Sequence, residues 1–252
     1  MNLAVCYLAN VILISRLIFT FHDEAVVRRQ TAVMLLLQGA GLLAYEMTVG
    51  VAALAAVLVL MGALIQVLES RLNKVQEVRL LSLLGYGLAL NVFFSPWVDL
   101  RFSPTLPGVV QSLGRYSLFL TLARTADLFE INIVLFGLLL VTNEVNTLVR
   151  YQFRLFDLEP KKQVQADEGV SATVDREEYN AGRVIGILER LLIYYLVLNA
   201  QFAAIGLVLA AKSFTRFRDL EKRTYAEYVL VGTLSSTLLA MLTAALVQVL
   251  LS

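Results

Sequence analysis

The amino-acid sequence predicts an all-α protein, a polytopic transmembrane helical bundle with about 6–8 membrane-embedded helices. Of its 252 residues, 58% are hydrophobic and 16% are charged, and the mean hydropathy is +0.73. Soluble domains contain only about 45–50% apolar residues. Several windows of about 18 or more residues are nearly free of charge, which is the length that crosses a bilayer core as a helix. Segments of alternating polarity, the pattern of transmembrane β-strands, are not visible.

Charge and residue counts argue against several classes of function. The net charge is +1, from 21 basic and 20 acidic residues, so no general attraction to nucleic acid is expected. The single cysteine, Cys6, excludes an intrachain disulfide and a thiolate metal cluster. The single histidine, His22, excludes a histidine-rich metal site, and we expect a structural or interfacial role for it. We therefore expect no metal, no cofactor and no enzymatic activity.

The first predicted span covers residues 3–21, and it is expected to be a retained anchor because no basic segment precedes it and no cleavage site follows. It contains Arg16, which we expect to extend to the nearer membrane surface because it lies close to the end of the span. The loop that follows contains Arg28 and Arg29, which favour the cytoplasm and therefore place the N-terminus outside.

Residues 31–68 are too long an apolar stretch for one ordinary span, so they predict a helical hairpin. The turn is expected at residues 45–50, where Glu46 supplies polarity. Two hypotheses remain for Glu46: a position in a turn at the outer surface, which we prefer, or a buried ligand for a proton or cation. Ala52 and Ala56 are four residues apart and would allow close packing of the second helix of this hairpin on a neighbour.

The chain is then expected to return to the cytoplasm, cross once more at residues 80–98, and reach the interface at Trp97. The cytoplasmic loop is predicted from three basic residues: Arg71, Lys74 and Arg79. Residues 108–126 lack a clean apolar run, and either an interfacial amphipathic helix or a re-entrant element fits them better than a span.

A span is predicted at residues 131–149, where Asn143, Asn146 and Arg150 share one helix face. We prefer an interhelical hydrogen-bonding seam with a cytoplasmic flank over a solute pathway for this face. Residues 158–180 are rich in charge and predict a cytoplasmic linker. The linker would separate an N-terminal membrane module, 1–157, from a C-terminal membrane module, 181–252.

The C-terminal module contains two pairs of small residues four apart, Gly182 with Gly186 and Gly232 with Ser236, which predict close helix packing. Residues 183–211 have two possible structures. One is a single tilted helix, and the other is a helix broken at 199–201 that returns to the same membrane face. The positive excess of residues 212–223 favours the broken form.

Ionisable side chains at or near membrane depth are costly, which makes each of them a candidate functional residue. Five such residues form the expected polar core: Glu189, Arg190, Lys212, Arg216 and Glu227. Lys212 and Arg216 are four residues apart, so they repel each other unless an anion or a carboxylate lies between them. Glu189 and Glu227 are the internal candidates, and lipid phosphates are the alternative partners.

Three stretches in the C-terminal module, GRVIGILERLLI, AIGLVLAAKSFTRF and AEYVLVGTLSS, preceded by NEVNTLVR, carry a resemblance. Together they resemble an uncharacterised family of bacterial integral-membrane proteins, described as a domain of unknown function. The resemblance implies a location in a bacterial inner membrane. It implies no activity, substrate or cofactor.

Two functions remain open from the sequence. The first is an oligomeric protein of the bilayer that forms or gates a path for an ion or small solute. The second is a membrane scaffold or effector that binds a soluble cytoplasmic partner through the 158–180 linker and the basic 212–223 loop. No nucleic-acid partner is expected, and no nucleophile and base have a usable spacing for an intramembrane enzyme.

Overall fold

The computed structural model describes residues 2–104 apart from positions 23, 73, 97 and 99, and residues 128–156, 176–215 and 223–252. Over these ranges the chain is 85% helical and contains no strand, which confirms the all-α class. The expected interfacial element at 108–126, the interfacial Trp97 and most of the expected linker at 158–180 lie outside the described residues.

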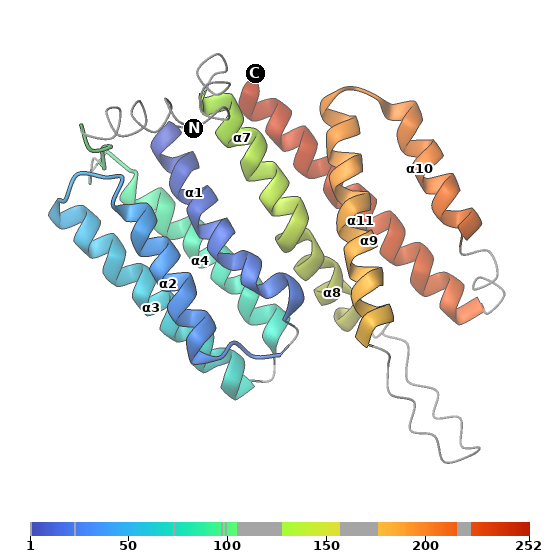
Figure 1. Cartoon of the computed structure of the whole chain (residues 1–252), viewed down its shortest axis with the longest axis horizontal. Helices are drawn as coiled ribbons and strands as arrows, with labels where there is room; N and C mark the ends of the chain where they lie inside the picture. Colours follow the sequence, from blue (N-terminus) through green and yellow to red (C-terminus); the bar gives the residue numbers. More distant parts are fainter. Residues whose placement is uncertain are drawn as a thin grey trace.

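The N-terminal half folds as antiparallel helices joined by short connections (Figure 1). Its elements are α1 (Leu3–Arg16), the 3-10 helix η1 (Leu17–Phe21), α2 (Arg28–Leu42), α3 (Val49–Leu72) and α4 (Val75–Phe93). The Asn2 side chain caps α1 by accepting a hydrogen bond from the Ala4 N–H at 3.3 Å. Helices α2 and α3 form the expected hairpin, and the turn between them includes Tyr45. The ring of Tyr45 stacks on the ring of Phe102.

The C-terminal half continues the up-and-down arrangement, and both chain ends lie at the same end of the bundle (Figure 1). Its elements are α7 (Leu128–Leu139), the π-helical turn η2 (Leu140–Glu144), α8 (Val145–Leu155), α9 (Arg176–Leu198), α10 (Phe202–Thr215) and α11 (Arg223–Leu251). Ala200 has a φ of 55°, a left-handed conformation that ends α9 and reverses the chain into α10. The structure therefore has the broken form of residues 183–211 and not a single tilted helix.

Two hydrophobic clusters form the interior, and α1 contributes to both. Leu8 of α1 packs in the first cluster with side chains of α2, α3 and α4 such as Met34, Leu54 and Tyr86. Cys6 on the same helix packs in the second cluster with side chains of α7, α9, α10 and α11. The expected division into modules at the 158–180 segment stays a prediction, but α7 already packs with the C-terminal helices.

In the described part of the chain, four helical segments are long and apolar enough to cross a membrane, which makes the chain a membrane protein by length and composition. They are Leu3–Phe21, Val49–Leu72, Leu128–Leu155 and Leu230–Leu251. The expected number of about 6–8 is too high for the described part of the chain, since a span needs about 20 apolar residues. Helices α2 and α10 have only 15 and 14 residues, and α4 and α9 carry charged side chains in their first halves.

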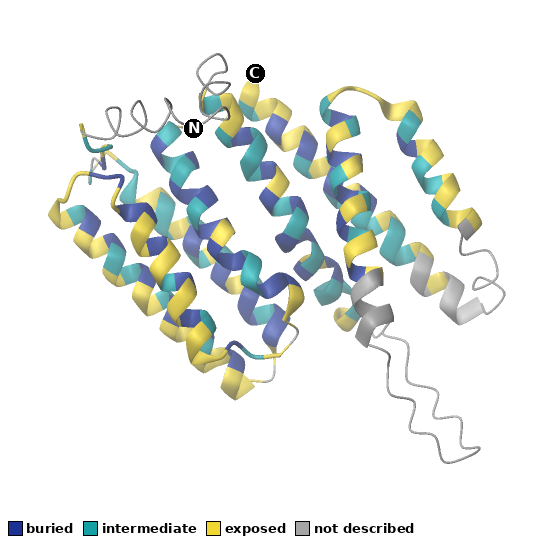
Figure 2. Ribbon diagram, in the orientation of Figure 1, coloured by how far each residue is buried: buried dark blue, intermediate teal, exposed yellow. Residues whose placement is uncertain are grey.

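The outer faces of the bundle are apolar, as lipid contact requires. Along α11, a leucine is exposed at every fourth position from Leu230 to Leu246, with 47–59% of each residue accessible. Figure 2 shows exposed residues along the outer sides of α3 and α11 as well as at the helix ends. An exposed apolar surface this long is unusual on a soluble monomer, and it is the expected surface of a helix that faces acyl chains.

Gly137 marks the tightest contact between α7 and the C-terminal helices, because a Cβ there would collide with Tyr194 and Val247. We expect Gly137→Ala to lower the free energy of unfolding by about 1–3 kcal/mol, the usual cost of overpacking. Denaturant titration of the purified protein in detergent measures the change.

Gly87→Ala on α4 is the matched control, because nothing lies within 4 Å of its added Cβ. It should be neutral or stabilise by up to about 1 kcal/mol through a better helix propensity. Equal destabilisation by both variants would contradict the packing described for Gly137.

Candidate functional site

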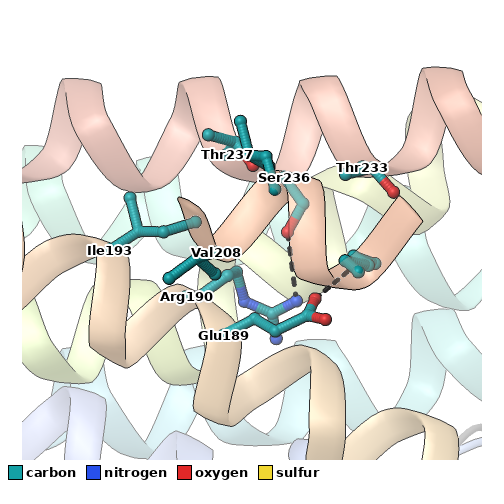
Figure 3. Close-up of a pocket in the computed structure, with 9 residues that line it drawn as sticks. Glu189, Arg190, Ile193, Val208, Thr233, Ser236 and Thr237 are labelled. Carbon is teal, nitrogen blue, oxygen red and sulfur yellow. Dashed lines mark hydrogen bonds and ion pairs between the residues drawn. The ribbon is translucent and has the colours of Figure 1, made fainter. Parts of the chain in front are cut away.

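A small polar pocket lies between α9, α10 and α11 (Figure 3). Its interior is on the scale of a single water molecule. The lining combines charged, hydroxyl and apolar side chains: Glu189, Arg190, Ile193, Val208, Leu209, Lys212, Thr233, Ser236 and Thr237. Helix α9 supplies the first three, α10 the next three, and α11 the three hydroxyl residues.

Glu189 and Lys212 form an ion pair that joins α9 to α10. The reversal of the chain at Ala200 brings these two residues together although they are 23 positions apart. The carboxylate side chain is 22% exposed and the ammonium side chain 19% exposed, so both groups are only partly withdrawn from solvent or lipid. The ion pair therefore forms one wall of the pocket and holds α10 against α9, the two helices on either side of the break.

Arg190 extends toward the bundle interior and is only 4% exposed. Its Nε donates to the backbone carbonyl of Val141 at 3.1 Å, and its Nη1 donates to Ser236 Oγ at 3.5 Å. Val141 lies in the π-helical turn η2, a distortion that is frequent at functional sites. The remaining nitrogen, Nη2, is buried without a hydrogen-bond partner. Arg190 is thus fixed in position and keeps one donor available.

Three of the five residues expected in the polar core line this pocket: Glu189, Arg190 and Lys212. Glu227 is exposed near the start of α11 and is not among the lining residues. Arg216 lies outside the described residues. The proposed mutual arrangement of Lys212 and Arg216 around an anion therefore stays a prediction.

The two pairs of small residues have different surroundings. Gly182 is exposed, and no described atom lies within 4 Å of the position a Cβ would take. The nearest atom to such a Cβ on Gly186 is Nη1 of Arg190 at 3.5 Å, from the same helix. Gly232, in contrast, lies tightly against the ring of Phe153, and Ser236 lines the pocket. Close packing is therefore seen at Gly232, and for the other three residues it stays a prediction.

A second polar region lies in the bundle interior, around Arg16. This side chain is fully buried and does not extend to the surface, so the expectation that it snorkels is wrong. Its Nε and Nη2 donate to Oε1 and Oε2 of Glu144 at 2.6 and 2.9 Å, in a bidentate ion pair. Its Nη1 donates to Ser82 Oγ at 2.7 Å, and Nη2 also donates to the Arg79 carbonyl at 2.9 Å. Because buried acceptors inside the bundle take the hydrogen bonds of Arg16, its guanidinium group does not have to reach the membrane surface to be solvated.

Arg79 forms a second buried ion pair, with Glu69, and is 1% exposed. The expectation that Arg79 lies in a solvated cytoplasmic loop is therefore wrong, because α4 begins before it and turns it inward. Its Nε donates to Glu69 Oε1 at 3.0 Å, and its terminal nitrogens donate to the carbonyls of His22 and Glu24. The Phe19 ring makes cation–π contacts with both guanidinium groups, and its centroid lies 5.1 Å from Cζ of Arg16 and 4.5 Å from Cζ of Arg79.

The expected polar seam partly joins this network. Asn143 is buried, accepts a hydrogen bond from Thr20 at 3.0 Å and donates to Glu144 at 2.9 Å. Asn146 and Arg150 are only half-buried. The main polar residue of this helix, Glu144, was not selected from the sequence. An acid within a predicted span, together with Arg16 in another span, was the signal that could have found the pair.

Three smaller expectations concern the surface and the turn. Glu46 is exposed beside the α2–α3 turn, and its backbone N–H donates to the Arg101 carbonyl at 3.1 Å. The neighbouring Tyr45 is buried, which raises the pKa of its hydroxyl group by desolvation. His22 is exposed, and its ring contacts the Ile18 carbonyl at 2.9 Å. Within the described ranges, no group of His, Cys, Asp and Glu side chains could hold a metal ion.

These features define a class of protein, a helical membrane protein whose described residues contain four candidate spans and two interior polar regions. Comparison of the chain with protein-family models, curated proteins and solved structures finds no match. The resemblance to an uncharacterised bacterial membrane family stays a prediction.

The Arg16–Glu144 pair should be essential for folding. We expect Glu144→Gln to lower the free energy of unfolding by about 3–5 kcal/mol, because it leaves the buried Arg16 cation without its counter-charge. The double variant Arg16→Met with Glu144→Leu should recover a large part of this loss, since it removes both charges. Denaturant titration in detergent, arranged as a double-mutant cycle, measures the coupling.

Arg154 and Glu77 provide an exposed comparison pair, with nitrogen and oxygen 3.3 Å apart and side chains 42% and 26% accessible. Arg154→Ala should change stability by no more than about 1 kcal/mol. A Glu144 variant that behaves like the Arg154 variant would refute the structural role of the buried pair.

Proposed function

We propose that this chain is a multi-pass protein of the bacterial inner membrane that gates a path for an ion or small solute. The observation that carries the proposal is the pocket between α9, α10 and α11. It joins two cationic side chains, one carboxylate and three hydroxyl groups, and it contains an unpartnered buried donor on Arg190. A purely structural polar cluster would be expected to satisfy all its donors, as the Arg16 network does.

The distribution of basic residues supports an orientation for the proposed protein. Arg28, Arg71, Lys74 and Arg154 are at helix ends that lie at the lower end of the bundle in Figure 1. Arg101 is at the opposite end. Because short cytoplasmic loops carry the excess of lysine and arginine, the lower end faces the cytoplasm and both termini face outward. The 158–180 linker is then cytoplasmic.

Helix α10 is the proposed gate. It lies at the edge of the bundle beside α9, and large side chains on it such as Leu207 and Phe214 are 72% and 80% exposed (Figure 1). The Glu189–Lys212 ion pair holds α10 against α9 over a pocket of about one water molecule in size. Separation of this pair would widen the pocket while α9 stays fixed through Arg190. We also propose that a homo-oligomer covers the exposed face of α10.

Breaking the ion pair tests the gate. Glu189→Ala and Lys212→Ala should each accelerate ion or solute release from proteoliposomes, by about fivefold if the pair contributes about 1 kcal/mol to the closed state. The charge-exchanged variant, Glu189→Lys with Lys212→Glu, should restore slow release because it rebuilds the pair. Release is measured with trapped salts and a fluorescent reporter.

Arg154→Ala is the control for this experiment, because its ion pair with Glu77 is exposed and lies outside the pocket. Its release rate should equal that of the unmodified protein. If the Glu189 and Lys212 variants only fail to fold, or fold with unchanged release, the pair is structural and the gate is refuted.

A membrane scaffold or effector is the second candidate function. It is favoured by the small size of the pocket and by the full satisfaction of the Arg16 side chain, both of which suit a rigid protein. In this case a soluble cytoplasmic partner would bind the 158–180 linker and the basic 212–223 loop.

Deletion of residues 163–173 distinguishes the two candidates. A path protein should keep its release rate in proteoliposomes after the deletion, because the pocket residues are unchanged. A scaffold should lose a partner that co-purifies with the full chain. If the deletion variant still binds the partner but no longer releases solute, the linker is neither the binding site of a scaffold nor a dispensable connector of a path protein.

A further inference from the structure

We infer that the pocket between α9, α10 and α11 binds a small monovalent anion of the size of chloride, and that this anion is the ion the proposed path conducts. The inference rests on the proposed function for its second part only. Anion binding itself follows from the charge, the donors and the size of the pocket.

The charge of the lining favours an anion. Arg190 and Lys212 contribute two positive charges, and Glu189 contributes one negative charge. Glu189 pairs with Lys212 and also lies near Arg190, so the one carboxylate is shared by two cations and the lining residues carry a net charge of +1. A monovalent anion restores neutrality in this partly desolvated place, whereas a cation would add to the excess. A buried charge without compensation is costly, so the site gains most from a single negative charge.

The hydrogen-bond donors favour the same ligand. Nη2 of Arg190 is buried and has no partner, although the other two nitrogens of this guanidinium are held by Val141 and Ser236. Figure 3 shows the guanidinium group between Glu189 on α9 and Ser236 on α11. Ser236 accepts a hydrogen bond from Nη1, so its own O–H is free to donate to a ligand. Thr233 and Thr237 line the same wall and add two hydroxyl groups.

The size of the pocket selects among anions. A space on the scale of one water molecule is closest in size to a monatomic ion. Chloride is somewhat wider than water, so the lining side chains must move apart slightly to accept it. Phosphate, sulfate and carboxylate metabolites contain several heavy atoms and would need a larger displacement of the lining side chains than a monatomic ion needs. The apolar side chains of Ile193, Val208 and Leu209 complete the wall, and they disfavour a large hydrated ion.

The Glu189–Lys212 ion pair couples anion binding to the proposed gate. Lys212 donates to Glu189 in the structure, and a halide beside Arg190 would compete with this carboxylate for the same ammonium group. Occupation of the pocket would therefore weaken the contact that holds α10 against α9. The ligand would then open its own path, and the empty pocket would close.

Chloride binding is tested on the full chain in lipid nanodiscs. The probe is potassium chloride, compared at equal ionic strength with potassium gluconate and with potassium phosphate, and the readouts are the thermal midpoint and the line width of the chloride NMR signal. Chloride should raise the midpoint in a saturable way, because a ligand that binds only the folded state stabilises it. Gluconate and phosphate should not.

Arg190→Gln should abolish the chloride effect, and Arg154→Gln, at the exposed Glu77 pair, should leave it unchanged. If Arg190→Gln does not fold, the variants Ser236→Ala and Thr237→Val test the anion site instead. Each should weaken chloride binding by about tenfold, because each removes one hydrogen-bond donor. A chloride effect that survives all three pocket variants would overturn the inference. So would equal stabilisation by gluconate, stronger stabilisation by phosphate, or no stabilisation by chloride.

Flux measurements separate this inference from the proposed function. Chloride binding without chloride release from proteoliposomes would leave the site valid and refute the path. Release of potassium without chloride binding would leave a path and refute the anion site. Chloride binding together with Arg190-dependent chloride release supports both.

Discussion

The buried ion pair between Arg16 and Glu144 is the interaction on which the rest of the structure depends. A guanidinium group and a carboxylate within an apolar bundle are costly unless each is paired and hydrogen-bonded. Here Glu144 takes two bonds from Arg16, while Ser82 and the Arg79 carbonyl take the others. The pair joins the first helix to the π-helical turn η2, and it thereby ties together the two hydrophobic clusters that share α1.

The π-helical turn connects this saturated region to the pocket. Glu144 at one end of η2 holds Arg16, and the carbonyl of Val141 in the same turn accepts from Arg190. The two arginines differ in one respect. Arg16 has its donors used within the bundle, whereas Arg190 keeps a buried nitrogen without a partner. A buried side chain whose hydrogen-bond donors are all used is typical of a fixed structural element, whereas an unused donor is expected at a site that receives a ligand.

The sequence predicted local features better than long-range ones. The helical class follows from apolar run lengths, and the polar character of Glu189 and Lys212 follows from charge within a short window. The break near Asn199 follows from the basic excess of the loop after it, although periodicity favoured a single helix. The Arg16–Glu144 contact joins residues 128 positions apart, and no local pattern records such a pairing. The number of spans was overestimated because the short α2 and the charged start of α4 pack against protein, which apolar composition alone does not reveal.

The order in which the chain is made gives the separation of Arg16 and Glu144 a consequence for biogenesis. Helix α1 leaves the ribosome long before the acid that neutralises its arginine, since Glu144 comes 128 positions after Arg16. Until η2 arrives, the nascent first helix carries an uncompensated cation that the lipid interior disfavours. We therefore expect Arg16 to become buried within the protein only after the helix starting at Leu128 has been made and packs against α1.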